Sequence, residues 1–263
     1  MEVILNINNL KYSYNDEKYI FNNLCMNIEK HSLTAISGPN SSGKTTLLKL
    51  LSTNKYNLKE TIILNGKDIV DYSKEEYDKQ VQALFYTNSF KERIVEDELY
   101  IDQEVIDEEK TNYLIDKFKI KSILNKEINK LDNKTKYKIL LIKRILNTSN
   151  LLLIDSLDEY FDKEEVSTII KILKKCIEKY DLTIIISINN LINSLETDKL
   201  YIINNGETVL SGDPMRVLEK DNIINKIGLD IPFMIDLSVK LRDYNLIDKI
   251  ILDKDKLINT LWK

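Results

Sequence analysis

Residues 38–46 read Gly-Pro-Asn-Ser-Ser-Gly-Lys-Thr-Thr and complete the pattern Gly-x-x-x-x-Gly-Lys-[Ser/Thr]. The apolar, β-branched run 33–37 precedes them, and residues 45–51 continue with the apolar spacing of a helix. This order predicts a strand, a loop and a helix. The two glycines would let successive backbone N–H groups point at phosphate oxygens, and the helix N-terminus would add partial positive charge. The stretch therefore predicts a phosphate-binding loop in an α/β fold.

The side chains of this loop have expected roles. Lys44 would reach the β- and γ-phosphates of a nucleotide, and the Thr45 hydroxyl would ligate Mg²⁺. The expected cofactors are therefore ATP and Mg²⁺. The residues expected to contact the nucleotide are Gly38, Pro39, Asn40, Ser41, Ser42, Gly43, Lys44, Thr45 and Thr46.

A second element of the expected site lies at Asp155. Four aliphatic residues, 151–154, come directly before it and predict a fully buried parallel strand. Ligands of such sheets bind beyond the carboxyl ends of the strands, so Asp155 is expected to hold Mg²⁺ directly or through water. An aspartate here could instead cap the next helix, although Asp162 could be that cap.

Composition excludes several classes of protein. The chain has 263 residues and is 43% hydrophobic, which is enough for one sizeable core. Its 38 basic and 42 acidic side chains leave a net charge of −4, so no basic field indicates binding to nucleic acid. The sequence shows neither an export signal nor a run of eighteen apolar residues, so we expect any membrane role to depend on a partner.

The hydrophobic pattern changes along the chain. Residues 2–30 and 61–66 read as antiparallel strands, whereas residues from about 87 to 147 are charged and helical. An α/β pattern then returns and ends in a hairpin centred on Asn204-Asn-Gly206. The expected fold is α/β: a P-loop NTPase with a RecA-like, mostly parallel sheet, an N-terminal antiparallel β portion and an inserted helical subdomain.

With these elements, the chain resembles the nucleotide-binding subunits of ABC transporters over nearly its whole length. The family places an aromatic that stacks on adenine where Lys11-Tyr-Ser-Tyr14 ends, which implies that role for Tyr14, although a core or surface tyrosine is the alternative. The tail from Ile227-Gly-Leu-Asp-Ile-Pro-Phe233 onward resembles the end of energy-coupling factor ATPases. The resemblance implies an ATP-binding domain over 1–215, with the helical insert at about 87–147, and a C-terminal helical tail over 216–263.

Three positions depart from the family pattern. Ser156 follows Asp155 where the family has a glutamate that polarises the attacking water, and losing a general base typically costs about 10²- to 10⁴-fold in rate. Asn189 aligns with the switch histidine, and Tyr86 with the glutamine that links Mg²⁺ and water to the transporter contact. Glu159 is acidic and near, but we expect it on a different part of the turn.

The family signature Leu-Ser-Gly-Gly-Gln, which reaches the partner's γ-phosphate across a dimer, aligns with Leu131-Asp-Asn-Lys-Thr135. Glycines there let N–H groups approach phosphate closely, whereas Asp132 would bring negative charge that Lys134 could offset. The following residues still predict the amphipathic helix of the family. We therefore expect the architecture to be kept while the site acting across the dimer is compromised.

These observations lead to one functional expectation and one alternative. The chain is expected to be the ATP-binding subunit of an ABC or energy-coupling factor importer, peripheral on the cytoplasmic face of the membrane. Its expected partners are a second, more complete ABC ATPase in a heterodimer and a transmembrane scaffold, with weak or absent hydrolysis in its own site. Whether it is an ATP-hydrolysing enzyme stays open. The alternative is a soluble ABC-type regulatory protein that is not tied to transport.

Overall fold

The central sheet carries the candidate site. We describe the chain from a computed structural model over residues 2–14, 19–56, 58–85, 89–103 and 105–262. Six strands form this sheet in the order β10-β9-β3-β8-β7-β6. The strands are β3 (Leu33–Ser37), β6 (Val81–Leu84), β7 (Leu151–Ile154), β8 (Thr183–Ser187), β9 (Lys199–Asn204) and β10 (Glu207–Gly212). All neighbours are parallel except β9 and β10, which form the predicted hairpin.

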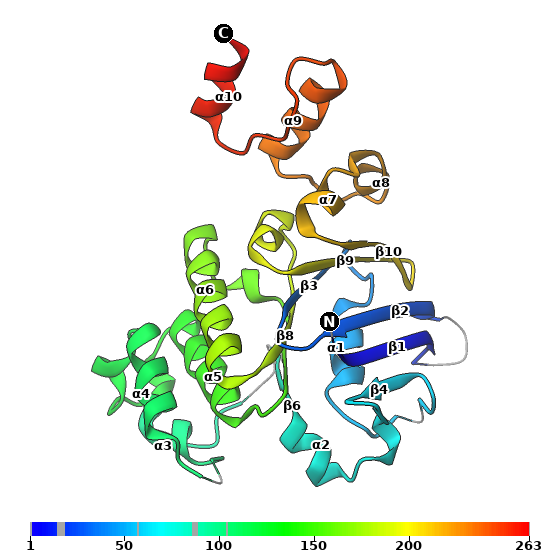
Figure 1. Ribbon diagram of the computed structural model, residues 1–263. Helices are drawn as coiled ribbons and strands as arrows, with labels where there is room; N and C mark the ends of the chain where they lie inside the picture. Colours follow the sequence, from blue (N-terminus) through cyan, green and yellow to red (C-terminus); the bar gives the residue numbers. More distant parts are fainter. Residues whose placement is uncertain (1, 15–18, 57, 86–88, 104, 263) are drawn as a thin grey trace.

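A second sheet confirms the predicted antiparallel β portion. Its order is β2-β1-β4-β5 and its paired strands run antiparallel. It comprises β1 (Val3–Tyr12), β2 (Phe21–Glu29), β4 (Ile62–Leu64) and β5 (Lys67–Asp68). Apolar residues of β2 alternate with exposed ones, as expected where one face packs on a core and the other meets water. This sheet lies to the right of the central sheet, with helix α1 between the two (Figure 1).

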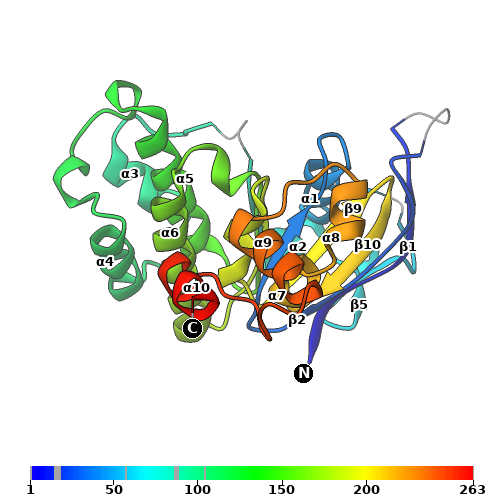
Figure 2. The ribbon, with the colours of Figure 1, turned by 90° about the horizontal axis from the view of Figure 1, so that it is seen from above.

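The central sheet is covered on both faces. Leu151, Leu153 and Ile185 pack in a core with α1 (Lys44–Leu51) and the antiparallel sheet. Leu152 and Ile154 point the other way, into a core with α5 (Asn133–Asn147) and α6 (Lys163–Tyr180). Because successive residues of a strand point to opposite faces, strands buried on both sides must be apolar throughout. Figure 2 shows the resulting layers from above.

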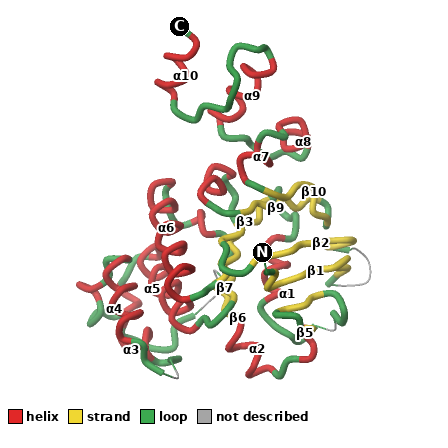
Figure 3. Tube along the Cα trace, in the orientation of Figure 1, coloured by secondary structure: helices red, strands yellow, loops and turns green. Residues whose placement is uncertain are grey.

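The helical insert lies on the α5 side of the sheet. It contains α3 (Val95–Tyr100), α4 (Glu108–Lys117) and α5, and a short helix, α2 (Lys74–Gln80), precedes β6. Helices gather in this insert and in the C-terminal part of the chain, whereas strands form the centre of the molecule (Figure 3). The predicted α/β fold with a helical subdomain is therefore confirmed.

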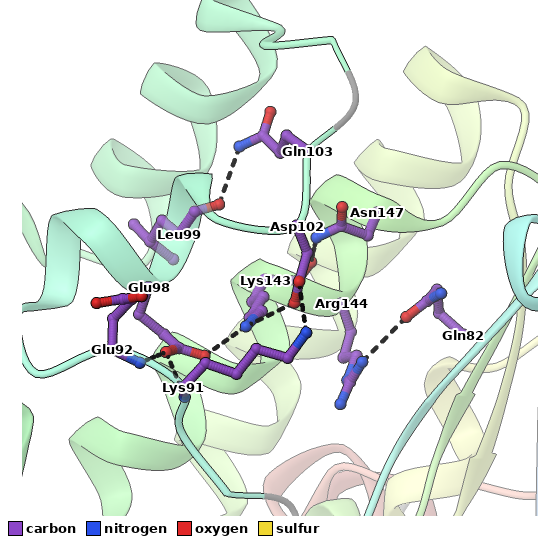
Figure 4. A network of polar contacts seen from close by, with 10 residues as sticks. All are labelled: Gln82, Lys91, Glu92, Glu98, Leu99, Asp102, Gln103, Lys143, Arg144 and Asn147. Carbon is purple, nitrogen blue, oxygen red and sulfur yellow. Dashed lines mark hydrogen bonds and ion pairs between the residues drawn. The ribbon is translucent and has the colours of Figure 1, made fainter.

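A buried ion network joins α3 to α5 inside the insert. Glu98 and Lys143 are almost fully buried and form an ion pair, and Lys143 also contacts Asp102 at 2.7 Å. The Glu98 carboxylate accepts the backbone N–H groups of Lys91 and Glu92 at 2.8 and 2.7 Å. Figure 4 shows Glu98 and Asp102 meeting Lys143, and the backbone of Lys91 and Glu92 meeting the Glu98 carboxylate. The network anchors the segment that leads into α3.

Four helices end the chain: α7 (Pro214–Leu218), α8 (Asp221–Lys226), α9 (Phe233–Asp243) and α10 (Lys254–Leu261). They extend from the hairpin end of the central sheet (Figure 1). Three buried residues form a small separate core there: Ile247, Ile251 and Leu257. The boundary predicted between 215 and 216 falls inside α7 and stays a prediction. No helix in the described part of the chain is both long and apolar enough to span a membrane.

Candidate nucleotide-binding site

The loop from Gly38 to Gly43 joins β3 to α1 and requires its two glycines. Gly43 has φ = 101°, and a Cβ there would come within 2.7 Å of the Phe21 ring. A Cβ on Gly38 would lie 2.1 Å from the carbonyl oxygen of Ile203. Glycine is therefore dictated at both positions by close packing, and at Gly43 also by its left-handed backbone.

Lys44 turns back over this loop. Its ammonium group donates to the carbonyl oxygens of Gly38 at 2.6 Å and of Pro39 at 3.3 Å. Burial lowers the pKa of Lys44, while the carboxylates of Asp155 and Asp158 act in the opposite direction. The cation is thus held inside the loop, where it can meet phosphate oxygens.

Thr45 and Asp155, the two residues expected to hold Mg²⁺, contact each other. The Thr45 hydroxyl donates to Oδ2 of Asp155 at 2.9 Å, and the Ser187 hydroxyl donates to Oδ1 at 2.7 Å. Hard oxygen donors of this kind suit Mg²⁺, which binds a few protein oxygens together with phosphates and water. The described residues hold no cluster of three or more His, Cys, Asp or Glu side chains for a metal. Phosphate oxygens would therefore have to complete the coordination.

A cleft of about 790 Å³ opens over the loop. Its lining includes Tyr14, the loop residues from Asn40 to Thr46, and two of the altered catalytic positions, Ser156 and Asn189. The buried Ser42 hydroxyl has no hydrogen-bond partner in the described structure, as expected for a group that waits for a ligand oxygen. The third altered position, Tyr86, lies outside the described residues.

The sequence missed part of this lining. Tyr19 and Ile20 lie along the cleft, and so does the hairpin turn Asn204–Gly206. The turn lies far from the phosphate loop in the sequence, and only the pairing of β9 with β3 brings it there. Tyr19 carried a usable signal, because an exposed aromatic close to Tyr14 can contact the same base.

Tyr14, the residue expected to stack on the base, lies at the rim of the cleft. Its side chain is 63% exposed, and its hydroxyl lies 3.2 Å from Oγ1 of Thr46. The ring meets the edge of Tyr12, with ring centroids 5.4 Å apart, and Tyr12 in turn meets Tyr56. These contacts orient an aromatic surface beside the loop, while an exposed face stays open for stacking.

Ser156 occupies a strained backbone position. Its φ and ψ are both 50°, in the left-handed region, and its N–H donates to the Ser187 hydroxyl at 2.7 Å. The short 3₁₀ helix η4 (Leu157–Glu159) follows, and exposed Glu159 lines the same cleft as Lys44. Glu159 therefore faces the same cleft as the phosphate loop. Ser156 itself carries no carboxylate that could act as a general base.

Asp158 holds the segment that carries Asn189, a contact that the sequence analysis missed. Its carboxylate accepts the backbone N–H groups of Asn189 and Asn190 and the side-chain amide of Asn193, at 2.8 to 3.0 Å. Asn189 and Asn190 come directly before the 3₁₀ helix η5 (Leu191–Glu196), and Asn193 lies within it. Asp158 thus ties the strand end after β7 to the segment after β8.

The signature segment 131–135 is fixed within the chain. Asp132 caps α5 by accepting the N–H of Thr135 at 2.8 Å, and Lys134 donates to Glu165 at 2.6 Å. Asp162 and Glu165 form a capping box at the start of α6. The sequence left the helix cap open between Asp155 and Asp162, and the structure shows that it is Asp162. Lys134 is therefore engaged by its own chain. The suggestion that Lys134 offsets the charge of Asp132 toward a partner's phosphate stays a prediction.

Comparisons with known proteins agree with this geometry. The sequence profile of the family described as ABC transporter matches residues 21–158, just over half of the chain. The energy-coupling factor transporter ATP-binding protein EcfA1 of Mesomycoplasma hyopneumoniae strain J is 25% identical over 260 residues, which cover 96% of this chain and 94% of that protein. EcfA of Pediococcus pentosaceus is 24% identical over 243 residues, covering 89% of this chain and 87% of that protein.

A solved structure has the same fold. CbiO1 from Clostridium perfringens, described as part of the ABC transporter complex cbiONQ, superposes with a TM-score of 0.74 at 22% identity. The match covers 90% of this chain and 99% of that one. The P-loop, the two sheets, the inserted helices and the matched profile lead to one conclusion: this chain belongs to the ABC transporter family, and it resembles energy-coupling factor transporter ATPases along most of its length.

Proposed function

We propose that this chain is the ATP-binding subunit of an ABC importer of the energy-coupling factor type. It would bind Mg-ATP at an interface between two ATPase subunits and lie peripherally on the cytoplasmic face of the membrane, coupled to a transmembrane scaffold. The observation that carries this proposal is a complete phosphate loop whose Thr45 meets Asp155, next to Ser156 in place of a base. The names of the similar EcfA proteins support the transporter assignment.

Each residue of the cleft is proposed to bind a different part of Mg-ATP. Lys44 would contribute positive charge to the β- and γ-phosphates, and Tyr14 would stack on the base. Thr45 and Asp155 would hold Mg²⁺, which neutralises phosphate charge when bound. The helix dipole of α1 favours the same anions, because the loop ends at the N-terminus of that helix.

Hydrolysis in this site is proposed to be weak or absent. Ser156 cannot accept a proton from water at neutral pH, and Asn189 can donate a hydrogen bond to a phosphate oxygen but carries no charge. Glu159 is the acidic residue among those that line the cleft in the described structure. Its 3₁₀ position three residues further along differs from that of a residue directly after Asp155.

A heterodimer is proposed because two copies of this chain would lack both the base and an intact signature. In a mixed dimer, the partner's phosphate loop would be completed by residues 131–135 of this chain. Lys134 is engaged by Glu165 and Asp132 caps α5, so Asn133 is the polar side chain of this segment best placed to serve there. The competent site is then proposed to be the partner's, because a displaced donor can be replaced more easily than an absent base.

Co-expression of this chain with a second ABC ATPase and a membrane scaffold encoded beside it tests the proposal. ATPase activity of the purified complex should disappear when the partner's catalytic glutamate is replaced, and should fall much less with Ser156→Ala in this chain. Full activity of a homodimer of this chain would contradict the model. If the subunits are all expressed but form no complex, the assignment of this chain to an importer is contradicted.

A further inference from the structure

Ser41 has a backbone conformation that is unusual for its residue type. Its φ is 63°, in the left-handed region. The N–H of Ser42 donates to the carbonyl oxygen of Pro39 at 3.1 Å, which closes a tight turn with Asn40 and Ser41 in the middle. A positive φ at the third residue is the feature of type II turns, where glycine is the usual residue. Serine therefore carries a conformational cost here that glycine would not have.

The left-handed backbone of Ser41 belongs to the phosphate loop. Gly43, two residues further along, is also left-handed, with φ = 101°. Successive N–H groups around such residues form a nest that binds an anion. Glycine at position 41 would give the same nest without the cost. The nest thus explains the conformation of residue 41, but it does not explain why the residue carries a side chain.

That side chain lies on the cleft side of the loop. Ser41 is exposed and lines the same cleft as Lys44 and Thr45. Because the loop of this pattern cradles phosphates, the Ser41 hydroxyl stands in the part of the cleft where phosphate oxygens are expected. A serine hydroxyl rotates freely and can donate to an oxygen that approaches it. The neighbouring Ser42, in contrast, is buried.

A donor at this point strengthens a site that has little charge elsewhere. Ser156 and Asn189 line the same cleft, and neither carries a charge. A hydrogen bond to an ionised phosphate is stronger than one between neutral groups. Residues held in sparsely populated backbone conformations cluster at ligand-binding sites, where the strain is part of the function.

We propose that the Ser41 hydroxyl donates to a phosphate oxygen of the bound nucleotide, and that the strained backbone of this residue is kept for that contact. The inference rests on the proposed nucleotide binding and deepens it, because it adds a phosphate ligand that acts independently of Mg²⁺. The group recognised is the phosphate chain and not the base.

Two variants of the full chain separate the hydroxyl from the backbone. Ser41→Ala removes the hydroxyl and keeps the left-handed cost, whereas Ser41→Gly removes both. In calorimetric titration, both should bind MgATP about tenfold more weakly than the parent, as loss of a hydrogen bond to a charged group typically does. In thermal unfolding without nucleotide, Ser41→Gly should raise Tm by about 2 °C, and Ser41→Ala should leave Tm close to that of the parent.

Lys119→Gly is the matched control. Lys119 is also left-handed, with φ = 57°, and its exposed side chain is not among those that line the cleft. The substitution should raise Tm by a similar amount and leave the affinity for MgATP unchanged. A gain in stability together with a loss of affinity is then a property of position 41, whereas a purely structural role would change Tm alone.

Titrations with two further probes identify the part of the nucleotide that is contacted. Inorganic triphosphate with Mg²⁺ has no base or sugar, and ATP with a chelator has no metal. Ser41→Ala should weaken the binding of both by about the same factor as the binding of MgATP. A loss confined to MgATP, with triphosphate unaffected, would assign the hydroxyl to the nucleoside and overturn the inference.

The remaining outcomes distinguish this inference from the proposed function. If Ser41→Ala or Ser41→Gly binds MgATP as tightly as the parent, the role of the hydroxyl is overturned, and nucleotide binding through Lys44 stands. If the parent binds neither MgATP nor triphosphate, the proposed function and this inference fail together.

Discussion

Thr45 and Asp155 lie 110 residues apart in the chain, yet the hydroxyl of one donates to the carboxylate of the other at 2.9 Å. Thr45 follows β3 and Asp155 follows β7, and both parallel strands end at the same edge of the central sheet. Two hard oxygen donors thus face one point beside the phosphate loop. This pairing is the structural basis for the proposed Mg²⁺ site.

Replacing Asp155 should therefore weaken the binding of MgATP more than the binding of ATP without Mg²⁺. We expect Asp155→Asn to weaken MgATP binding by about tenfold or more, as loss of a coordinating or orienting carboxylate typically does. Binding of ATP in the presence of a chelator should change much less, because Lys44 and the loop remain. Titration calorimetry with and without Mg²⁺ measures both, and equal losses in the two conditions would exclude a metal role for Asp155.

Lys44→Ala should weaken MgATP binding by about tenfold to a hundredfold, the range of one charge-assisted contact to phosphate. Lys49 lies on the same helix with an exposed side chain and makes the matched control, for which we expect no change on Lys49→Ala. Parent-like affinity of the Lys44 variant would show that the loop does not bind the nucleotide.

The lowered pKa of Lys44 gives this contact a dependence on pH. Burial is the largest cause of the lowering, so the ammonium loses its proton at a pH below the ordinary 10.5. The attraction to phosphate is present below the pKa of Lys44 in the folded chain and is lost as the pH rises through it. Nucleotide affinity measured at increasing alkaline pH should fall for the parent and for Lys49→Ala. The Lys44→Ala variant should lack this fall.

Tyr14 is expected to contribute through its ring rather than its hydroxyl. Tyr14→Ala should weaken nucleotide binding by roughly fivefold to a hundredfold, since stacking on an aromatic is worth about 1–3 kcal/mol per base. Tyr14→Phe should stay within about twofold of the parent, because it keeps the ring and loses only the contact with Thr46. Equal losses for the two variants would instead assign the role to the hydroxyl.

Ser156→Glu alone is expected to restore little hydrolysis. The new glutamate would occupy a left-handed backbone position with φ = 50°, which disfavours residues other than glycine, and Asn189 would still lack charge. Groups that act as one catalytic unit are strongly non-additive. We expect phosphate release to stay within about threefold of the parent, with Lys44→Ala as the baseline. A gain of a hundredfold would show that the missing base is the only defect.

The ion network of the insert is expected to support folding. Glu98→Ala removes the fully buried partner of Lys143 and should lower the free energy of unfolding by about 3–5 kcal/mol, as breaking a buried pair typically does. Glu127→Ala removes a surface carboxylate that contacts exposed Arg93 and Lys130, and it should cause a much smaller loss. Denaturant unfolding of both variants compares them. Similar midpoints would show that the Glu98 network adds nothing to stability.

Local features of the sequence were sufficient for much of this site. The run 38–46 combines glycines, a lysine and a hydroxyl at fixed spacing, and the structure places it as a loop between β3 and α1. Ser156 and Asn189 were identified through the resemblance to the ABC family, and both line the cleft. The capping of α6 by Asp162 was left open between two aspartates, and only the structure decided it.

Contacts between segments that lie far apart in the chain could not be predicted from such local features. Asp158 meets Asn189, Lys134 meets Glu165, and the hairpin turn at Gly206 reaches the loop cleft. Each contact joins segments that belong to different strands or helices. Hydrophobic periodicity indicates which face of a strand is buried, but it does not give the order of strands in a sheet.

The sequence by itself determined which chemical groups this protein has: a phosphate loop, a carboxylate for a metal, and no base or charged sensor at the usual positions. A side chain's chemistry belongs to the residue, so that information is complete before the chain folds. The tertiary structure decided which of these groups work together. The order β10-β9-β3-β8-β7-β6 places the ends of β3, β7 and β8 side by side, and this proximity brings Thr45 to Asp155 and Asp158 to the Asn189 segment.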